Sequence, residues 1–188
     1  MASSSHSDWY TKLIKDDLKF IKKLDKRLKK SNYSFYKFMH IIINKNPQKD
    51  ICIIIWIIHI IGLYFIGFNH YFIVFINMLL VMILRNIYTI TIPFDYDIKL
   101  GPLTDLNLDN RAFPSFESYI GTVILLDFSL YFNRLYIYIL CIFSLAIVGF
   151  SRVLSRAKFP RQIVASNLLG ILGWIIVQLI YHFSSVHK

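Results

Sequence analysis

The sequence predicts an all-α protein, a multi-pass helical membrane bundle of about five transmembrane helices with an N-terminal amphipathic helix. Two observations predict this fold. The chain is 56% hydrophobic with a mean hydropathy of +0.52, which is too apolar for an ordinary water-soluble core. Its apolar residues also gather into uncharged runs; Ile51–Phe68 spans 18 residues and would cross about 27 Å of hydrocarbon as a helix.

The N-terminal region, residues 1–50, is basic and carries no membrane span. From Asp8 to about Lys30, apolar residues recur at three- and four-residue steps between lysines and aspartates, which predicts an amphipathic helix. We expect this helix either to lie on an anionic cytosolic leaflet or to remain solvated and merely set the topology. We expect no nucleic-acid partner, because a membrane-anchored basic helix does not need one.

The remaining residues, 51–188, form the predicted transmembrane domain. Five apolar segments are expected to span: Ile51–Phe68, His70–Leu84 with a continuation to Pro93, Ser118–Asn133, Leu135–Ser151 and Gln162–Tyr181. The third is interrupted by Asp127. The second and third are the weaker of the five, and a tight turn at Gly67–Asn69 is expected between the first two.

The charges indicate how the chain crosses the membrane. Twelve of the 21 Lys and Arg residues precede residue 50, and seven more fall in the two loops that five spans place on the same side. The positive-inside rule therefore predicts a cytosolic N-terminus. The absence of a cleavable signal favours the endoplasmic reticulum or a connected membrane, and the aspartates of the first 25 residues argue against a mitochondrial transit peptide.

The cysteines give no sign of a cofactor or metal. Cys52 and Cys141 both fall inside predicted spans, so neither a disulfide framework nor a metal-ligand spacing is present. We expect no cofactor and no bound metal.

Three stretches carry a family resemblance. "RNIYTITIP" (85–93) ends the second span, "FPSFES" (113–118) opens the third, and "SRVLSRAKFPRQ" (151–162) links the last two. Together they resemble the type 2 phosphatidic acid phosphatase (PAP2) superfamily, which includes lipid phosphate phosphatases and glucose-6-phosphatase. Its signature is K-x6-R-P, then P-S-G-H, then S-R-x5-H-x3-D, and glucose-6-phosphatases carry F-P and a glutamine in the third motif, as here.

The motifs depart from the family at the positions that the resemblance makes catalytic. Arg85 replaces the first lysine and Ile92 the arginine, while Pro93 is kept. In the second motif Ser115 is kept, Phe116 replaces glycine and Glu117 replaces histidine. In the third motif Ser151 and Arg152 are kept. Lys158 replaces the nucleophilic histidine, and Gln162 replaces aspartate.

These changes bear on hydrolysis. The resemblance implies a histidine nucleophile and a second histidine that protonates the leaving group, but none of the six histidines lies between residues 71 and 181. A lysine nucleophile would be unusual, and an ionised Glu117 would repel a phosphate. Glu117 could replace the acid only if burial raised its pKa. We therefore expect hydrolysis to be lost rather than altered, with no catalytic residue retained.

Two interpretations of the remaining residues stay open. Arg85, Ser115, Arg152 and Lys158 are candidates for binding a phosphate or lipid headgroup at a helix end. Alternatively, Glu117 and Lys158 form an internal ion pair that fills the former site and closes the bundle.

Several residues inside the spans are notable. Asp127 is an intramembrane carboxylate and thus a functional candidate; its alternative role is hydrogen bonding to a neighbour such as Ser129, Ser144 or Asn167. His59 and His182 are expected to be helix-packing residues. Gly170 and Gly173 are expected to permit close helix contact.

The function predicted is that of a catalytically degenerate membrane protein that binds a lipid phosphate or a membrane protein partner without hydrolysis. Its partners would then include anionic or phosphorylated lipids. The alternatives are a divergent lipid or sugar phosphatase with a non-histidine nucleophile, and a structural subunit of a membrane assembly.

Overall fold

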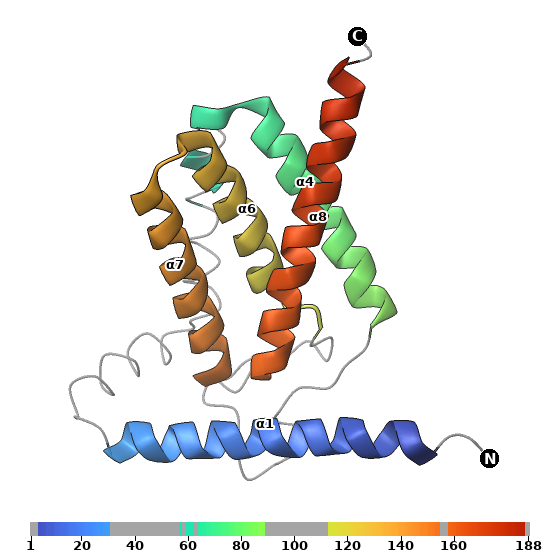
Figure 1. Ribbon diagram of the computed structural model, residues 1–188, viewed down its shortest axis with the longest axis vertical. Coiled ribbons are helices and arrows are strands. Elements are labelled where there is room, and N and C mark those ends of the chain that lie inside the picture. Colours follow the sequence, from blue (N-terminus) through green and yellow to red (C-terminus); the bar gives the residue numbers. More distant parts are fainter. Residues whose placement is uncertain are drawn as a thin grey trace.

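The computed structural model describes residues 4–30, 57, 59–61, 64–88, 113–154 and 158–186. In this part of the chain every regular element is a helix. The helices are α1 (Ser4–Lys30), α4 (Phe68–Ile87), α6 (Phe116–Phe132), α7 (Leu135–Leu154) and α8 (Pro160–Val186). The predicted all-α class is confirmed, and α1 lies across one end of a bundle made by the other four (Figure 1).

The bundle is built around α6, which packs against α4, α7 and α8. Its residues are buried on nearly all sides, including the polar ones. The apolar core lies between α4, α6 and α8. It is made of eight buried residues, Ile73, Val74, Val81, Tyr119, Ile120, Val123, Ile124 and Val177.

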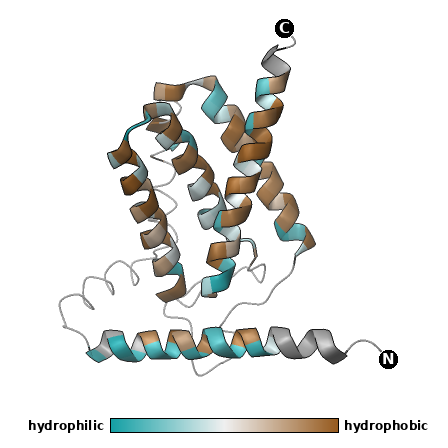
Figure 2. Cartoon of the chain, in the orientation of Figure 1, coloured by the Kyte–Doolittle hydropathy of each residue, from teal (hydrophilic) through white to brown (hydrophobic). Residues whose placement is uncertain are grey.

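Within the described part of the chain, three helices are long and apolar enough to cross a membrane: α4, α7 and, in α8, Pro160–Phe183. They coincide with the predicted second, fourth and fifth spans. Large apolar side chains such as Phe75, Ile142 and Leu172 point outward, and hydrophobic residues predominate on the bundle in Figure 2. Helix α6 covers the residues of the predicted third span, but with 17 residues it is not one of these three long apolar helices, so its crossing of the membrane stays a prediction.

The described residues of the first predicted span are 57, 59–61 and 64–68. The turn that follows falls at Gly67, whose φ of 83° is a conformation that glycine adopts readily. Helix α4 begins directly after it, at Phe68, so Asn69 is already helical.

Local sequence explains the other helix ends. Asn133 closes α6 in the left-handed conformation with φ 44°, and its N–H donates to the Ser129 carbonyl at 3.0 Å. Pro160 opens α8, where its missing N–H costs nothing.

Glycines let α8 approach α6 closely, as predicted. A Cβ on Gly170 would lie 2.7 Å from the Tyr119 carbonyl oxygen. A Cβ on Gly173 would overlap the Tyr119 hydroxyl and the Asn77 amide oxygen. These two side chains meet there in a hydrogen bond of 3.0 Å from Tyr119 Oη to Asn77 Oδ1.

The predicted amphipathic helix is confirmed as α1, and its apolar stripe packs on the bundle. Ile14 and Ile21 are buried against the α7–α8 junction, in a cluster completed by Val153, Phe159 and Ile163. Its basic side chains are exposed: Lys12, Lys15, Lys19, Lys22, Lys23, Lys26, Arg27 and Lys30. Placement on an anionic leaflet stays a prediction.

An ion pair joins α1 to α8, because Arg161 Nε lies 3.4 Å from Asp17 Oδ1. Burial raises the pKa of the Asp17 carboxyl, although the Arg161 guanidinium lowers it. Cys141 is a free, buried cysteine on α7. Cys52, Ile92, Pro93 and the predicted domain boundary at residue 50 lie outside the described residues.

Candidate functional site

The second and third motif stretches meet at the end of the bundle that α1 covers. Helix α6 begins there at Phe116, α7 ends there at Leu154, and α8 begins there at Pro160 (Figure 1). Residues far apart in sequence therefore converge at helix ends, where unpaired backbone groups and helix dipoles favour charged ligands.

A buried ion pair occupies the centre of this site. Glu117, in the first turn of α6, accepts a hydrogen bond from Arg152 Nη2 through Oε1. Both side chains are almost wholly buried, with 8% and 3% exposed for Glu117 and Arg152. The second carboxylate oxygen accepts from the Ser115 hydroxyl at 3.1 Å. The carboxylate thus holds the position of an anion between a helix N-terminus and a guanidinium.

Lys158 lies beside this pair. Its backbone N–H donates to the Arg152 carbonyl at 3.3 Å, which holds Lys158 against the last turn of α7. The Lys158 side chain is buried, and its charge acts favourably on Glu117. The sequence predicted an internal ion pair between Glu117 and Lys158. Among the contacts described for these residues, Glu117 pairs with Arg152, and a direct pair with the neighbouring Lys158 stays a prediction.

Gln162, at the position where the family carries aspartate or glutamine, caps the N-terminus of α8. Its Oε1 accepts a hydrogen bond of 3.0 Å from the backbone N–H of Phe159, the residue before α8. A third-position side chain that reaches back to the residue before the helix is half of a capping box. Gln162 therefore fixes the start of α8 and the connection that carries Lys158.

Ser115 is held in place by α8. Its backbone N–H donates to Ser166 Oγ at 2.7 Å, and Ser166 donates in turn to the Gln162 carbonyl at 2.6 Å. These bonds fix the start of α6 against α8. The geometry around Glu117 is therefore rigidly supported on two sides.

The first motif contributes less to the described site. Arg85 is in the last turn of α4 at the same end of the bundle and is partly exposed. Its part in anion binding stays a prediction, and Ile92 lies outside the described residues.

Residues 66–185 match the profile described as the PAP2 superfamily. The chain belongs to the PAP2 superfamily. No curated protein and no solved structure matches it. This membership confirms the predicted resemblance and, with the long apolar helices, the membrane helical bundle.

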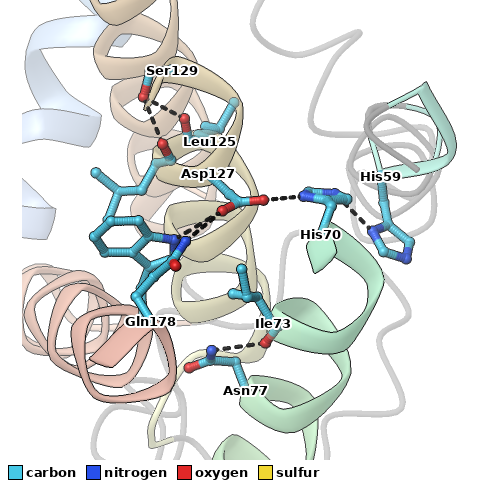
Figure 3. A network of polar contacts seen from close by, with 10 residues as sticks. His59, His70, Ile73, Asn77, Leu125, Asp127, Ser129 and Gln178 are labelled. Atoms are coloured by element: carbon cyan, nitrogen blue, oxygen red, sulfur yellow. Dashed lines mark hydrogen bonds and ion pairs between the residues drawn. The ribbon is translucent and has the colours of Figure 1, made fainter. Parts of the chain in front are cut away.

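The PAP2 bundle of this chain also holds a second buried polar cluster, toward the end opposite α1. Asp127 Oδ2 lies 2.5 Å from His70 Nδ1, and His70 Nε2 lies 3.3 Å from His59 Nδ1. Asp127 Oδ1 accepts from Trp174 Nε1 at 3.3 Å and Gln178 Nε2 at 3.1 Å. Figure 3 shows Asp127 of α6 reaching His70 on one side and Gln178 on the other.

These partners differ from the ones proposed for Asp127 from the sequence. Ser129 and Ser144 donate to carbonyls of their own helices, and Asn167 accepts from Thr122. Sequence reasoning missed His70 altogether. The available signal was that His70 and Asp127 are ionisable residues within two apolar segments, each of which needs a buried partner.

Proposed function

We propose that this PAP2 member is a pseudophosphatase, which keeps an anion site at the helix ends, occupies it with its own Glu117 carboxylate and binds a lipid phosphate there without hydrolysis. The observation that carries the proposal is the buried Arg152–Glu117 pair, with Ser115 donating to the same carboxylate. A carboxylate held by a guanidinium, a hydroxyl and a helix N-terminus has the partners that a phosphate oxygen would take.

The net positive charge of the site favours binding of an anionic ligand. Arg152 and Lys158 carry two positive charges against the one negative charge of Glu117, and all three side chains are buried. A phosphate that displaced Glu117 would bring two negative charges and neutralise both cations. Glu117 would then act as an internal competitor that weakens headgroup binding in the resting protein.

The same residues argue against hydrolysis. The described histidines of the bundle lie away from Glu117. His59 and His70 are in the polar cluster near Asp127, ten residues along α6 from Glu117, and His182 is exposed near the C-terminal end of α8. Ten helical residues correspond to about 15 Å, beyond the reach of an attack on phosphorus at Arg152. Glu117 is held as an acceptor by its donors and is poorly placed to give up a proton.

Binding of short-chain phosphatidic acid to the full chain in detergent, followed by titration calorimetry, tests this proposal. Glu117→Gln removes the internal competitor and should tighten binding at least about tenfold. Arg152→Gln should abolish binding. Phosphatidylcholine of the same chain length is the matched ligand control. Equal affinities for both lipids, or weaker binding by Glu117→Gln, would contradict the proposal.

A protein partner is the second candidate, supported by the exposed basic face of α1 and the closed state of the anion site. Co-purification of a stoichiometric membrane partner from the native membrane, with no lipid-phosphate binding by either variant, would favour it.

We further propose that the α1 end faces the cytosol of the endoplasmic reticulum or a connected membrane. Support comes from the charges, since Arg152, Lys158, Arg161 and the lysines of α1 lie at that end. Acceptor sites for N-glycosylation appended to each terminus test the orientation. The site at the N-terminus should stay unmodified, and the site at the C-terminus, at the opposite end of the bundle from α1, should be glycosylated.

A further inference from the structure

Helix α1 presents a basic face on the side opposite its contact with the bundle. Ile14 and Ile21 mark the face that packs on the bundle. With 3.6 residues per turn, six exposed cations lie within about 50° of the point opposite these two residues. They are Lys12, Lys19, Lys23, Lys26, Arg27 and Lys30.

This basic face points away from the membrane that holds the bundle. The apolar helices α4, α7 and α8 run steeply to α1, which lies across their ends (Figure 1). The bilayer is therefore on the side of α1 that carries Ile14 and Ile21. Because the headgroups of that leaflet lie on the docked side, the basic face meets whatever approaches from the aqueous phase.

The charges on the face are crowded near the C-terminal end of α1. Four of them repeat at three- and four-residue steps: Lys23, Lys26, Arg27 and Lys30. None of these four has an acidic residue three or four positions away in the sequence, and like charges at such spacings destabilise a helix. The helix dipole favours cations only within the last turn, so it does not account for Lys23. An anionic surface would remove the repulsion.

The same four side chains border an open hollow of about 560 Å³. Cations around a hollow of this size leave room between them for phosphate groups. The basic face therefore suits an anionic surface that can send headgroups between its side chains.

The composition of the face favours a lipid surface over a protein. Seven of the eight exposed cations of α1 are lysines. Lysine acts as a point charge and is depleted in protein interfaces, whereas arginine supplies bidentate contacts. Clusters of basic residues on amphipathic helices are typical of binding to anionic lipids. The helix also spreads its cations along about 27 Å between Lys12 and Lys30, which fits a flat surface.

We propose that the basic face of α1 binds the anionic leaflet of a second membrane, apposed to the one that holds the bundle, so that the protein connects two membranes. The burial of Ile14 and Ile21 fixes the face in this orientation, and the pair between Asp17 and Arg161 at 3.4 Å supports it. This surface is separate from the site at Arg152 and binds whether or not that site holds a lipid phosphate.

The test uses the full chain in nanodiscs of pure phosphatidylcholine, mixed with sucrose-loaded vesicles that are then sedimented. The nanodiscs should co-sediment with phosphatidylcholine vesicles that contain about a quarter phosphatidylserine, and not with vesicles of phosphatidylcholine alone. Added sodium chloride should weaken the co-sedimentation. The double variant Lys23→Gln, Lys26→Gln should lower the affinity at least about tenfold.

Arg134→Gln is the control, because it removes an exposed cation at the opposite end of the bundle, between α6 and α7. This variant should co-sediment as the wild type does. Equal co-sedimentation with both kinds of vesicle, or equal losses in Arg134→Gln and the double variant, would overturn the proposal.

Absence of co-sedimentation would overturn it as well, and two further measurements would then identify the true partner of the face. Slower trypsin cleavage of α1 when phosphatidylserine is placed in the nanodisc itself would assign the face to its own leaflet. Capture of the nanodiscs on immobilised poly-L-glutamate would indicate an acidic protein segment.

Discussion

At the residue scale, Glu117 and Arg152 depend on each other. Each is buried and each is the other's ion-pair partner. Removal of Arg152 leaves Glu117 with only the neighbouring Lys158 charge, and removal of Glu117 leaves the Arg152 guanidinium without its carboxylate. Such a loss costs about 3–5 kcal/mol, whereas the intact pair adds little beyond apolar packing.

Arg152→Ala should therefore destabilise the protein by about 3–5 kcal/mol, measured by reversible unfolding in detergent. Arg161→Ala is the matched control, because the Arg161 side chain is 49% exposed and its pair with Asp17 should contribute at most about 1 kcal/mol. Equal losses in the two variants would show that Glu117 is not held as described.

Gly173→Ala should destabilise the contact between α8 and α6 by about 1–3 kcal/mol, because the added methyl overlaps Tyr119 and Asn77. Thermal unfolding in detergent measures the effect. Leu172→Ala, at the neighbouring outward-facing position with 55% exposure, should change stability by less than about 0.5 kcal/mol. An unchanged melting temperature for Gly173→Ala would mean that the helices lie further apart.

The sequence predicted which residues belong to the polar sites better than it predicted which residues pair with each other. The sequence marked Glu117, Arg152 and Lys158 as one site because their motifs have a family order, and it marked Asp127 because a carboxylate inside a span needs a reason. It could not assign Glu117 to Arg152 or Asp127 to His70. Such pairings depend on the rotation of each helix about its axis, which a span of uniform hydrophobicity leaves undetermined.

At the scale of elements, α1 is held to the bundle by a narrow apolar stripe. Ile21 is 3% exposed in the cluster with Phe159 and Ile163, whereas the adjacent Phe20 is 51% exposed. The apolar positions were predictable from their periodicity. That they pack on α7 and α8 rather than on lipid was not, because both environments reward the same pattern.

Ile21→Asp should release α1 from the bundle, since a carboxylate would be buried in that cluster without a partner. Limited trypsin cleavage at the lysines of α1 should then accelerate at least about tenfold. Phe20→Asp is the control on the exposed face and should leave the cleavage rate nearly unchanged. Similar rates in both variants would contradict the docking.

Asp17 should make the docking of α1 depend on pH. Because burial raises the pKa of this carboxyl in the folded protein, against the lowering effect of Arg161, the docked state favours protonated Asp17. Docking should be strongest below the ordinary aspartate pKa of about 3.9 and weaken as pH rises through the raised value.

Asp17→Asn should therefore protect α1 from hydrogen exchange at neutral pH at least as well as the wild type and should remove the weakening with rising pH. Asp16→Asn, whose 48% exposed side chain lies 4.0 Å from Lys19, is the neighbouring comparison. Because the Asp16 charge also raises the pKa of Asp17, this variant should keep the weakening of docking with rising pH but shift it to lower pH. Loss of protection in Asp17→Asn would show that attraction to Arg161 outweighs burial.

Whole-helix predictions succeeded where apolar runs were long and uncharged. The second to fifth predicted spans correspond to α4, α6, α7 and α8, with ends displaced by a few residues. Those displacements arise from capping, such as the return of Gln162 to the Phe159 N–H, which extends α8 to Pro160. The first predicted span lies largely outside the described residues.

At the scale of the whole molecule, the bundle carries polar chemistry near both ends and an apolar core between them. The end at α1 gathers the PAP2 motif residues around an internal carboxylate, and the opposite end holds the Asp127 chain of histidines. If both polar sites served one reaction, polar residues would have to connect them through the bundle. The core residues Ile73, Val123 and Ile124 instead separate them.

We propose that the substitutions at Glu117 and Lys158 have removed hydrolysis from this PAP2 bundle. The most direct measurement is phosphate release by the purified chain in detergent, from a panel of lipid phosphates and glucose 6-phosphate. Wild type, Lys158→Ala and the double variant Glu117→His, Lys158→His are compared. We expect no turnover by wild type or by Lys158→Ala, with any activity confined to the double variant. Turnover by wild type that disappears in Lys158→Ala would contradict it and place the nucleophile at Lys158.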